Sequence, residues 1–108
     1  MDKPGKKPLI SVITVVFNGE QYLEQAIKSV INQADNHSEY IIIDGGSSDG
    51  TLEIIRKYET HIDSWTSEPD KGIFDAMNKG IKNATGEFIG MLNADDWYEP
   101  GILEKVKN

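Results

Sequence analysis

Two adjacent carboxylates, Asp95 and Asp96, are the clearest candidates for chemistry in this sequence. They directly follow residues 88–92, an apolar run with the composition of a strand buried on both faces. Two carboxylates at such a position repel each other and need a cation, a hydroxyl or water. We predict that Asp95 and Asp96 hold a divalent metal and part of a nucleotide. A solvated acidic turn is the alternative.

Asp44 is a second candidate, because it ends the apolar run at residues 40–43. A carboxylate at that position is partly buried and needs hydrogen-bond donors. Two sources of donors fit the sequence equally well: the ring N–H of a base such as uracil, or groups of the loop that follows Asp44. Ser48 or Asp49 in that loop is typical of a helix cap.

Alternating strand and helix patterns position these acids. Strands are predicted over residues 9–17, 40–43, 62–67 and 88–92, and a helix is predicted after each, beginning near Glu20, Asp49, Gly72 and Glu99. Apolar stripes at helical spacing comprise Leu23, Ala26, Ile27, Val30, Ile31 and Ala34, and then Ile73, Ala76, Met77, Gly80, Ile81 and Ala84. Gly80 within its stripe predicts a close contact between helix and sheet. The order βαβαβαβα predicts an α/β, Rossmann-like fold with a mostly parallel sheet.

Parallel strands bring their carboxyl ends to one edge of the sheet, where ligands bind in folds of this class. We therefore expect four groups to gather along one rim: Phe17 with Asn18, Asp44, residues 68–70, and Asp95 with Asp96. Phe17, at the end of the first strand, either lies against a base or packs within the protein. Neither His37 nor His61 is expected near the rim, and the chain has no cysteine, so the metal ligands are expected to be oxygens and the metal Mn²⁺ or Mg²⁺.

The composition limits the partners of this protein. Eighteen acidic and eleven basic residues give a net charge of −7, which argues against nucleic acid or an anionic membrane surface as a partner. The same charge makes binding of an anionic diphosphate dependent on a metal. The absence of cysteine excludes disulfides and fits a cytoplasmic location, and no apolar run approaches the ~20 residues of a membrane span.

The 108 residues are enough for one domain. Residues 1–7 are polar and interrupted by proline, so we expect a disordered lead-in before a folded unit at residues 8–108. His37 and His61 are expected on the surface, away from the rim. Lys71, Asp75 and Lys79 are spaced for surface ion pairs on the third helix, and Lys71 is alternatively a phosphate contact.

Four segments, in order along the chain, resemble the signatures of family 2 glycosyltransferases. They are residues 12–18 with Tyr22, Leu23 and 29–33, then 42–51 (IIDGGSSDGT), 67–80 (SEPDKGIFDAMNKG) and 93–96 (NADD). The resemblance implies a GT-A fold and binding of a nucleoside-diphosphate sugar, with UDP as the expected nucleotide. It also implies transfer of a sugar to a glycan or lipid-linked acceptor, as in polysaccharide biosynthesis.

The resemblance also implies a role for each residue of the rim. In that reading Asp44 bonds the base, Phe17 lines its pocket, Asp70 lies near the nucleotide, Asp95 reaches the ribose, and Asp96, beside Asp95, holds the metal. Asn93 stands where many members carry an aspartate in a D-x-D pattern, which leaves fewer charges on the metal.

Members of this family invert the sugar configuration and need a carboxylate base for the acceptor hydroxyl. In the family that base lies well after the acidic pair, and no later motif precedes Asn108. We therefore expect a truncated GT-A domain, the donor-binding half, which does not transfer sugar alone. Its uncovered apolar surface and strand edge predict a homo-oligomer.

Two other hypotheses remain open. One is a non-catalytic remnant that only folds and associates with itself. The other is a receiver-like signalling domain that binds a metal. Receiver domains place an acidic pair after the first strand and a lysine after the fifth, whereas here Phe17 and Asn18 end the first predicted strand and no fifth strand is predicted.

Overall fold

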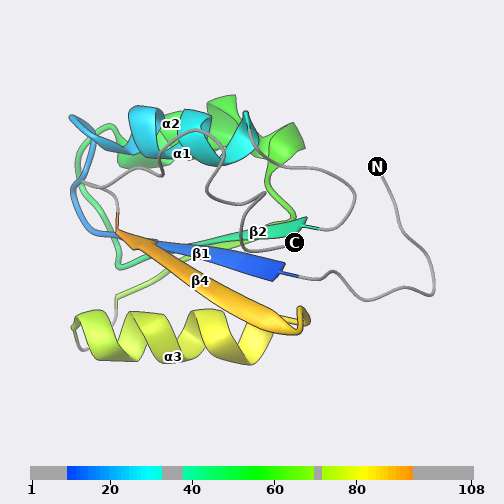
Figure 1. Ribbon diagram of the computed structural model, residues 1–108. Coiled ribbons are helices and arrows are strands. Elements are labelled where there is room, and N and C mark those ends of the chain that lie inside the picture. The colour runs from blue at the N-terminus through cyan, green and yellow to red at the C-terminus, as the bar shows by residue number, and fades with distance from the viewer. Residues whose placement is uncertain (1–9, 33–37, 70–71, 94–108) are drawn as a thin grey trace.

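The computed structural model describes residues 10–32, 38–69 and 72–93, which form a parallel sheet between two layers of helices (Figure 1). The elements are β1 (Ile10–Val16), α1 (Leu23–Ile31), β2 (Ser38–Asp44), α2 (Thr51–Lys57), the 3₁₀ turn η1 (Glu59–His61), β3 (Ser64–Ser67), α3 (Ile73–Asn83) and β4 (Phe88–Asn93). Residues 1–7, Ala34 and the helix expected near Glu99 lie outside the described residues.

The sheet has the strand order β3-β2-β1-β4, and every pair of neighbouring strands is parallel. The predicted α/β class and parallel sheet are therefore confirmed. The chain moves outward from β1 to β3 and then returns to the other side of β1 as β4. Helices α1 and α2 consequently cover one face of the sheet and α3 covers the other (Figure 1).

The core has two parts because β1 and β2 are buried on both faces. Side chains that alternate along these strands divide between the two helical layers. Val12 and Ile42 pack with α1 and α2, whereas Ile13 and Ile41 pack with α3. A buried polar pair lies within the core: the hydroxyls of Thr14 and Tyr40 lie 2.9 Å apart.

Strand β4 corrects the prediction that residues 88–92 are buried on both faces. Among the described residues β4 pairs only with β1, and Phe88 is 54% exposed and Ile89 43% exposed. Leu92, by contrast, is buried. The sequence also predicts that Ile81 faces inward, but this residue is exposed.

Two smaller differences concern the ends of elements. The third strand begins at Ser64 rather than Ile62, because η1 occupies the residues before it and the Ile62 N–H donates to the Glu59 carbonyl. The residue that precedes α2 is Gly50, and Asp49 lies one position earlier. The Asp49 carboxylate accepts a hydrogen bond from the N–H of Thr51, the first residue of α2, at 2.9 Å.

Gly80 confirms the predicted close contact between helix and sheet. A Cβ atom placed on Gly80 would lie 2.5 Å from Cγ2 of Ile13, inside the distance that real side chains keep. The absence of a side chain thus sets how closely α3 approaches β1.

We predict that Gly80→Ala destabilises the protein by up to about 2 kcal/mol, because the added methyl group overpacks the core at a cost of about 1–3 kcal/mol. The gain in helix propensity on replacing glycine by alanine, about 1 kcal/mol, offsets part of this cost. Chemical denaturation measures the effect. Asn78→Ala, at an exposed position of the same helix, is the control and should be neutral or slightly stabilising. Equal stability of the two variants would contradict the close contact.

Glu24 links α1 to the end of α2. Its carboxylate accepts hydrogen bonds from Lys57 Nζ at 2.8 Å and from the Tyr58 hydroxyl. The Lys57 ammonium and then the Tyr58 hydroxyl lower the pKa of Glu24 from 4.5 to about 2. These groups are partly exposed, so the link adds to the apolar contacts between the helices and does not replace them.

We predict that Glu24→Gln lowers the melting temperature at pH 7. A carboxyl whose folded pKa is depressed stabilises the fold above its ordinary pKa of 4.5, and this contribution is lost as the pH falls toward 2. The difference between variant and wild type should therefore shrink over that range in thermal unfolding scans. Glu53→Gln, at an exposed position of α2, is the control. A difference that does not vary with pH would argue against this role of Glu24.

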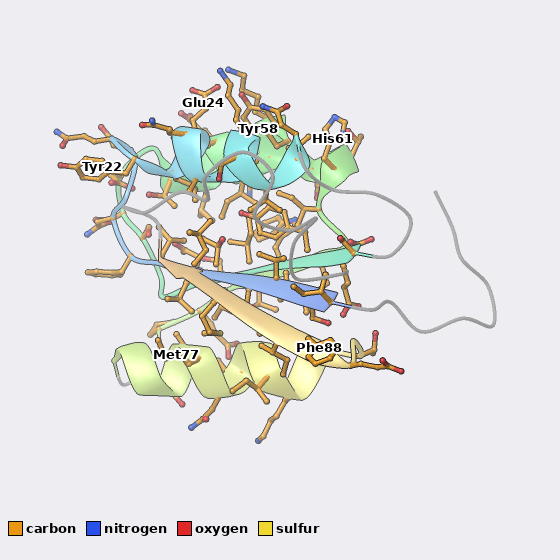
Figure 2. The ribbon with its side chains drawn as sticks, viewed as in Figure 1. Tyr22, Glu24, Tyr58, His61, Met77 and Phe88 are labelled. Atoms are coloured by element: carbon orange, nitrogen blue, oxygen red, sulfur yellow. The ribbon has the colours of Figure 1, made fainter. Side chains whose placement is uncertain are left out.

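The predicted homo-oligomer would form at β4, where Phe88 and Ile89 are exposed on opposite faces of a strand that pairs, among the described residues, only with β1. We expect the Phe88→Ser and Ile89→Ser double variant to lower the average mass in light scattering at high protein concentration. Tyr22→Ser, at an exposed position far from Phe88 (Figure 2), serves as the control. A wild-type monomer at every concentration would refute the prediction.

Candidate functional site

The carboxyl ends of the strands are level at one edge of the sheet. The register pairs Val16 with Asp44 and Asp44 with Ser67, and it pairs Val15 with Asn93. The predicted gathering of strand ends along one rim is confirmed for these four strands.

The strand order marks one place on this rim. The connections reverse direction between β1 and β4, and open α/β sheets bind ligands outside the carboxyl ends of strands at such a switch point. Phe17 directly follows β1 there and is 64% exposed. The backbone of Asn93 ends β4 next to it in the sheet, and the chain continues from there to Asp95 and Asp96.

Asp44 lies at the end of β2 and is completely buried. Its Oδ2 atom accepts hydrogen bonds from the Gly46 N–H at 3.1 Å, the Ser47 N–H at 2.9 Å and the Ser67 hydroxyl at 2.7 Å. Its Oδ1 atom accepts the Ser47 hydroxyl. Of the two sources of donors that the sequence left open, the structure thus contains the local one. The predicted contact with a base stays a prediction.

The glycine-rich loop at residues 45–48 directs its backbone N–H groups into the protein. Gly45 donates to the Val16 carbonyl at 2.9 Å and Ser48 donates to Asn18 Oδ1 at 2.8 Å. The N–H groups of Gly46 and Ser47 are the two that donate to Asp44. A phosphate-binding loop instead points its N–H groups at the ligand. The 45–48 loop is therefore not built as a phosphate cradle.

The loop after β1 is tied to the 45–48 loop and to the start of α2. The Asn18 N–H donates to Ser47 Oγ at 2.7 Å. Asn18 has a φ of 51°, in the left-handed region that asparagine tolerates better than most residues. Farther on, the Gly50 N–H donates to Glu20 Oε1 at 2.6 Å and the Glu20 N–H donates to Asp49.

Asp49 is held in its charged form by these contacts. The Thr51 hydroxyl, which donates to Asp49 Oδ1, makes the largest contribution to lowering the pKa of this carboxyl below its ordinary value. Asp49 thus holds the beginning of α2, but the N-cap residue is Gly50 and not Ser48 or Asp49 as the sequence predicts.

The segment after β3 also meets the 45–48 loop. Gly46 has a φ of +89°, and a Cβ atom on it would lie 3.2 Å from the backbone nitrogen of Pro69. The Glu68 N–H donates to the Asp44 carbonyl at 3.0 Å. On α3, Lys79 Nζ lies 3.1 Å from Glu68 Oε2 and 3.6 Å from Asp75 Oδ2. The pair of Lys79 and Asp75 was predicted, and the pair with Glu68 was not.

Three of the predicted site residues, Asp70, Asp95 and Asp96, lie outside the described residues, as does Lys71. Their predicted roles stay predictions. Within residues 10–32, 38–69 and 72–93, no group of three or more His, Cys, Asp or Glu side chains could hold a metal ion. His61 is exposed and lies at the other end of the molecule from Tyr22 (Figure 2), as its predicted surface position requires.

Sequence reasoning missed the hydroxyls that meet Asp44. The loop after Asp44 is predicted as one source of donors, but neither Ser47 nor Ser67 is singled out. The available signal was the position of Ser67 at the end of the strand that follows Asp44, since neighbouring parallel strands end at the same rim.

None of the helices in the described part of the chain is long and apolar enough to cross a membrane.

Comparison with known protein sequences gives one consistent family. The family model described as "Glycosyl transferase family 2" matches residues 11–108. TuaG of Bacillus subtilis (strain 168), named as a glycosyltransferase of teichuronic acid biosynthesis, is 38% identical over 102 residues, which are 92% of this chain and 40% of TuaG. An uncharacterized glycosyltransferase of Mycobacterium tuberculosis, Rv1514c, is 41% identical over 101 residues, which are 92% of this chain and 38% of that protein. The chain spans well under half the length of these curated relatives.

Solved structures agree in fold. Staphylococcus aureus TarS 1–349, solved in complex with UDP-GlcNAc, superimposes with a TM-score of 0.82 at 26% identity, over 91% of this chain and 30% of TarS 1–349. The mannosyltransferase PcManGT of Pyrobaculum calidifontis, solved with GDP-Man and Mn²⁺, gives a TM-score of 0.75 at 24% identity, over 88% of this chain and 30% of PcManGT. The likeness to PcManGT shows the fold alone.

These matches decide between the hypotheses on family. The four signatures, the parallel sheet and the matched residues 11–108 agree, and they leave no support for a receiver-like domain. The chain belongs to glycosyl transferase family 2 and has the GT-A type of α/β fold.

Proposed function

We propose that this chain binds a nucleoside-diphosphate sugar together with a divalent metal, as the donor-binding part of an inverting glycosyltransferase. The observation that carries the proposal is the switch point of the sheet, between the carboxyl ends of β1 and β4, at which an exposed Phe17 and the strand leading to Asp95 and Asp96 meet. The likeness to TarS, whose structure contains UDP-GlcNAc, supports a nucleotide sugar as the ligand.

In this proposal the rim residues divide the nucleotide and the metal between them. Phe17 lies beside the base, Asp70 lies near the nucleotide, Asp95 reaches the ribose, and Asp96 with Asp95 would hold Mn²⁺ or Mg²⁺. Carboxylate oxygens are suitable ligands for both metals. Asp44 belongs to the base end of the site.

The need for a metal follows from the charges and from the 45–48 loop. The chain has a net charge of −7, so a diphosphate approaching the acidic rim is repelled. The N–H groups that a glycine-rich loop could offer to phosphates are used within the protein, by Val16, Asp44 and Asn18. A bound cation is therefore the means of neutralising the diphosphate, and it would also stabilise the charge of the departing group.

The proposed reaction of the whole protein is a single displacement. The acceptor hydroxyl oxygen forms a bond to the anomeric carbon as the bond from that carbon to the diphosphate oxygen breaks, and the diphosphate leaves with the electron pair. A carboxylate base takes the hydroxyl proton. The acceptor, a glycan or a lipid-linked sugar, and a cytoplasmic location belong to the same proposal.

We predict that the chain binds UDP with Mn²⁺ and that Asp96→Asn weakens this binding by roughly tenfold or more, equivalent to about 1.4 kcal/mol or more. The physical reason is the loss of one charged ligand from the metal. Calorimetric titration with and without Mn²⁺ measures it, and Glu53→Gln, the same charge change at an exposed position of α2, is the control. Equal UDP affinity with and without Mn²⁺ would overturn the metal assignment. The absence of UDP binding would favour a non-catalytic remnant.

A further inference from the structure

We propose that Asp44 serves nucleotide recognition without touching the base: it is a positioning residue that acts through the 45–48 loop on Phe17. The inference rests on the proposed function, because it concerns the same nucleotide site. It replaces the direct contact with a base that the family resemblance implies for Asp44.

Most of the acceptor capacity of the Asp44 carboxylate is already used. Three donors reach Oδ2, which has about two lone-pair sites: the N–H groups of Gly46 and Ser47 and the hydroxyl of Ser67. The Ser47 hydroxyl takes one site of Oδ1. The side chain is also completely buried. A base N–H could bond to Oδ2 only by displacing one of its donors, two of which belong to the backbone of the loop itself, and it could reach Oδ1 only by opening the packing that buries the side chain.

The location of Asp44 in the sheet points the same way. β2 is separated from β4 by β1, so Asp44 lies one strand away from the switch point at which ligands bind in such sheets. Ser67, on its other side, lies one strand farther out. Asp44 is thus placed behind the expected ligand position and not at it.

Its hydrogen bonds lead from there to the residue that does lie at the switch point. The Ser47 hydroxyl donates to Asp44, and the same oxygen accepts the Asn18 N–H at 2.7 Å. Asn18 Oδ1 in turn accepts the Ser48 N–H at 2.8 Å. These bonds fix Asn18 in its left-handed conformation with φ 51°, and Asn18 directly follows Phe17. The charge of Asp44 therefore sets the direction in which the chain presents Phe17.

This role differs measurably from a direct contact. The ring N–H of uracil or guanine can donate to a carboxylate, whereas cytosine and adenine have a ring acceptor at the corresponding position. A direct hydrogen bond between Asp44 and the base would therefore favour uracil and guanine over cytosine and adenine. An aromatic ring that stacks on a base does not, because every base has a π-face.

The test is calorimetric titration of the chain with UDP, GDP, CDP and ADP in the presence of Mn²⁺. We expect Asp44→Asn to weaken every nucleotide that the wild type binds by the same factor, about tenfold or more, as is typical when a supporting residue behind a site is lost. The ratio of the UDP and CDP affinities should stay at its wild-type value. Loss of UDP and GDP binding with CDP and ADP binding unchanged would overturn the inference.

Ser47→Ala provides a second test that keeps the Asp44 carboxylate. It removes the hydroxyl that joins Asp44 to Asn18, so we expect the same uniform loss, and Ser47→Thr should restore binding. Ser48→Ala is the matched control, because the bond from Ser48 to Asn18 uses its backbone N–H. Unchanged or stronger UDP binding by Ser47→Ala would show that its hydroxyl only competes with a ligand for Asp44, which contradicts positioning.

These outcomes distinguish failure of the proposed nucleotide binding from failure of the positioning role of Asp44. If the wild type binds no nucleotide with or without Mn²⁺, the proposed function fails and this inference fails with it. If the wild type binds and the losses are selective for UDP and GDP, only the inference fails. If circular dichroism shows that Asp44→Asn is unfolded, the three substitutions at Ser47 and Ser48 decide.

Discussion

A buried negative charge at the end of β2 has to be satisfied, and the rim of this domain is arranged around that requirement. Asp44 collects donors from its own loop and from β3, and through Ser47 it is connected to the loop after β1. Three connections that are far apart in the sequence are thereby held in one arrangement. Leaving such a carboxylate without donors would cost several kcal/mol, so the loops and the charge depend on one another.

Much of the fold could be predicted from the sequence because its local signals agree with one another. The β-branched runs that became β1 and β2 are buried on both faces, and Gly80 falls where the helix lies against Ile13. Strand β4 shows the limit of this reasoning. An apolar run indicates a strand but not how many neighbours it has, and Phe88 remains exposed at the edge of the described sheet.

The candidate site was predictable in position and less so in detail. Parallel topology alone brings strand ends to one rim, so the location required no coordinates. The environment of Asp44 could not be predicted in this way, because a carboxylate after an apolar run can accept hydrogen bonds from a ligand or from the following loop equally well. The answer depended on Ser67, whose approach to Asp44 arises from strand pairing between residues 23 positions apart.

The inward direction of the N–H groups in the 45–48 loop has a consequence for how this surface behaves in solvent. Amide protons held by acceptors inside the protein exchange slowly, so a loop at the surface would show the protection usual for a strand. Its conformation would be set during folding and would be the same before and after a ligand arrives. A ligand or partner that binds at this rim would therefore contact a 45–48 loop whose conformation is already formed. Any conformational change on binding would occur in the neighbouring segments of the rim.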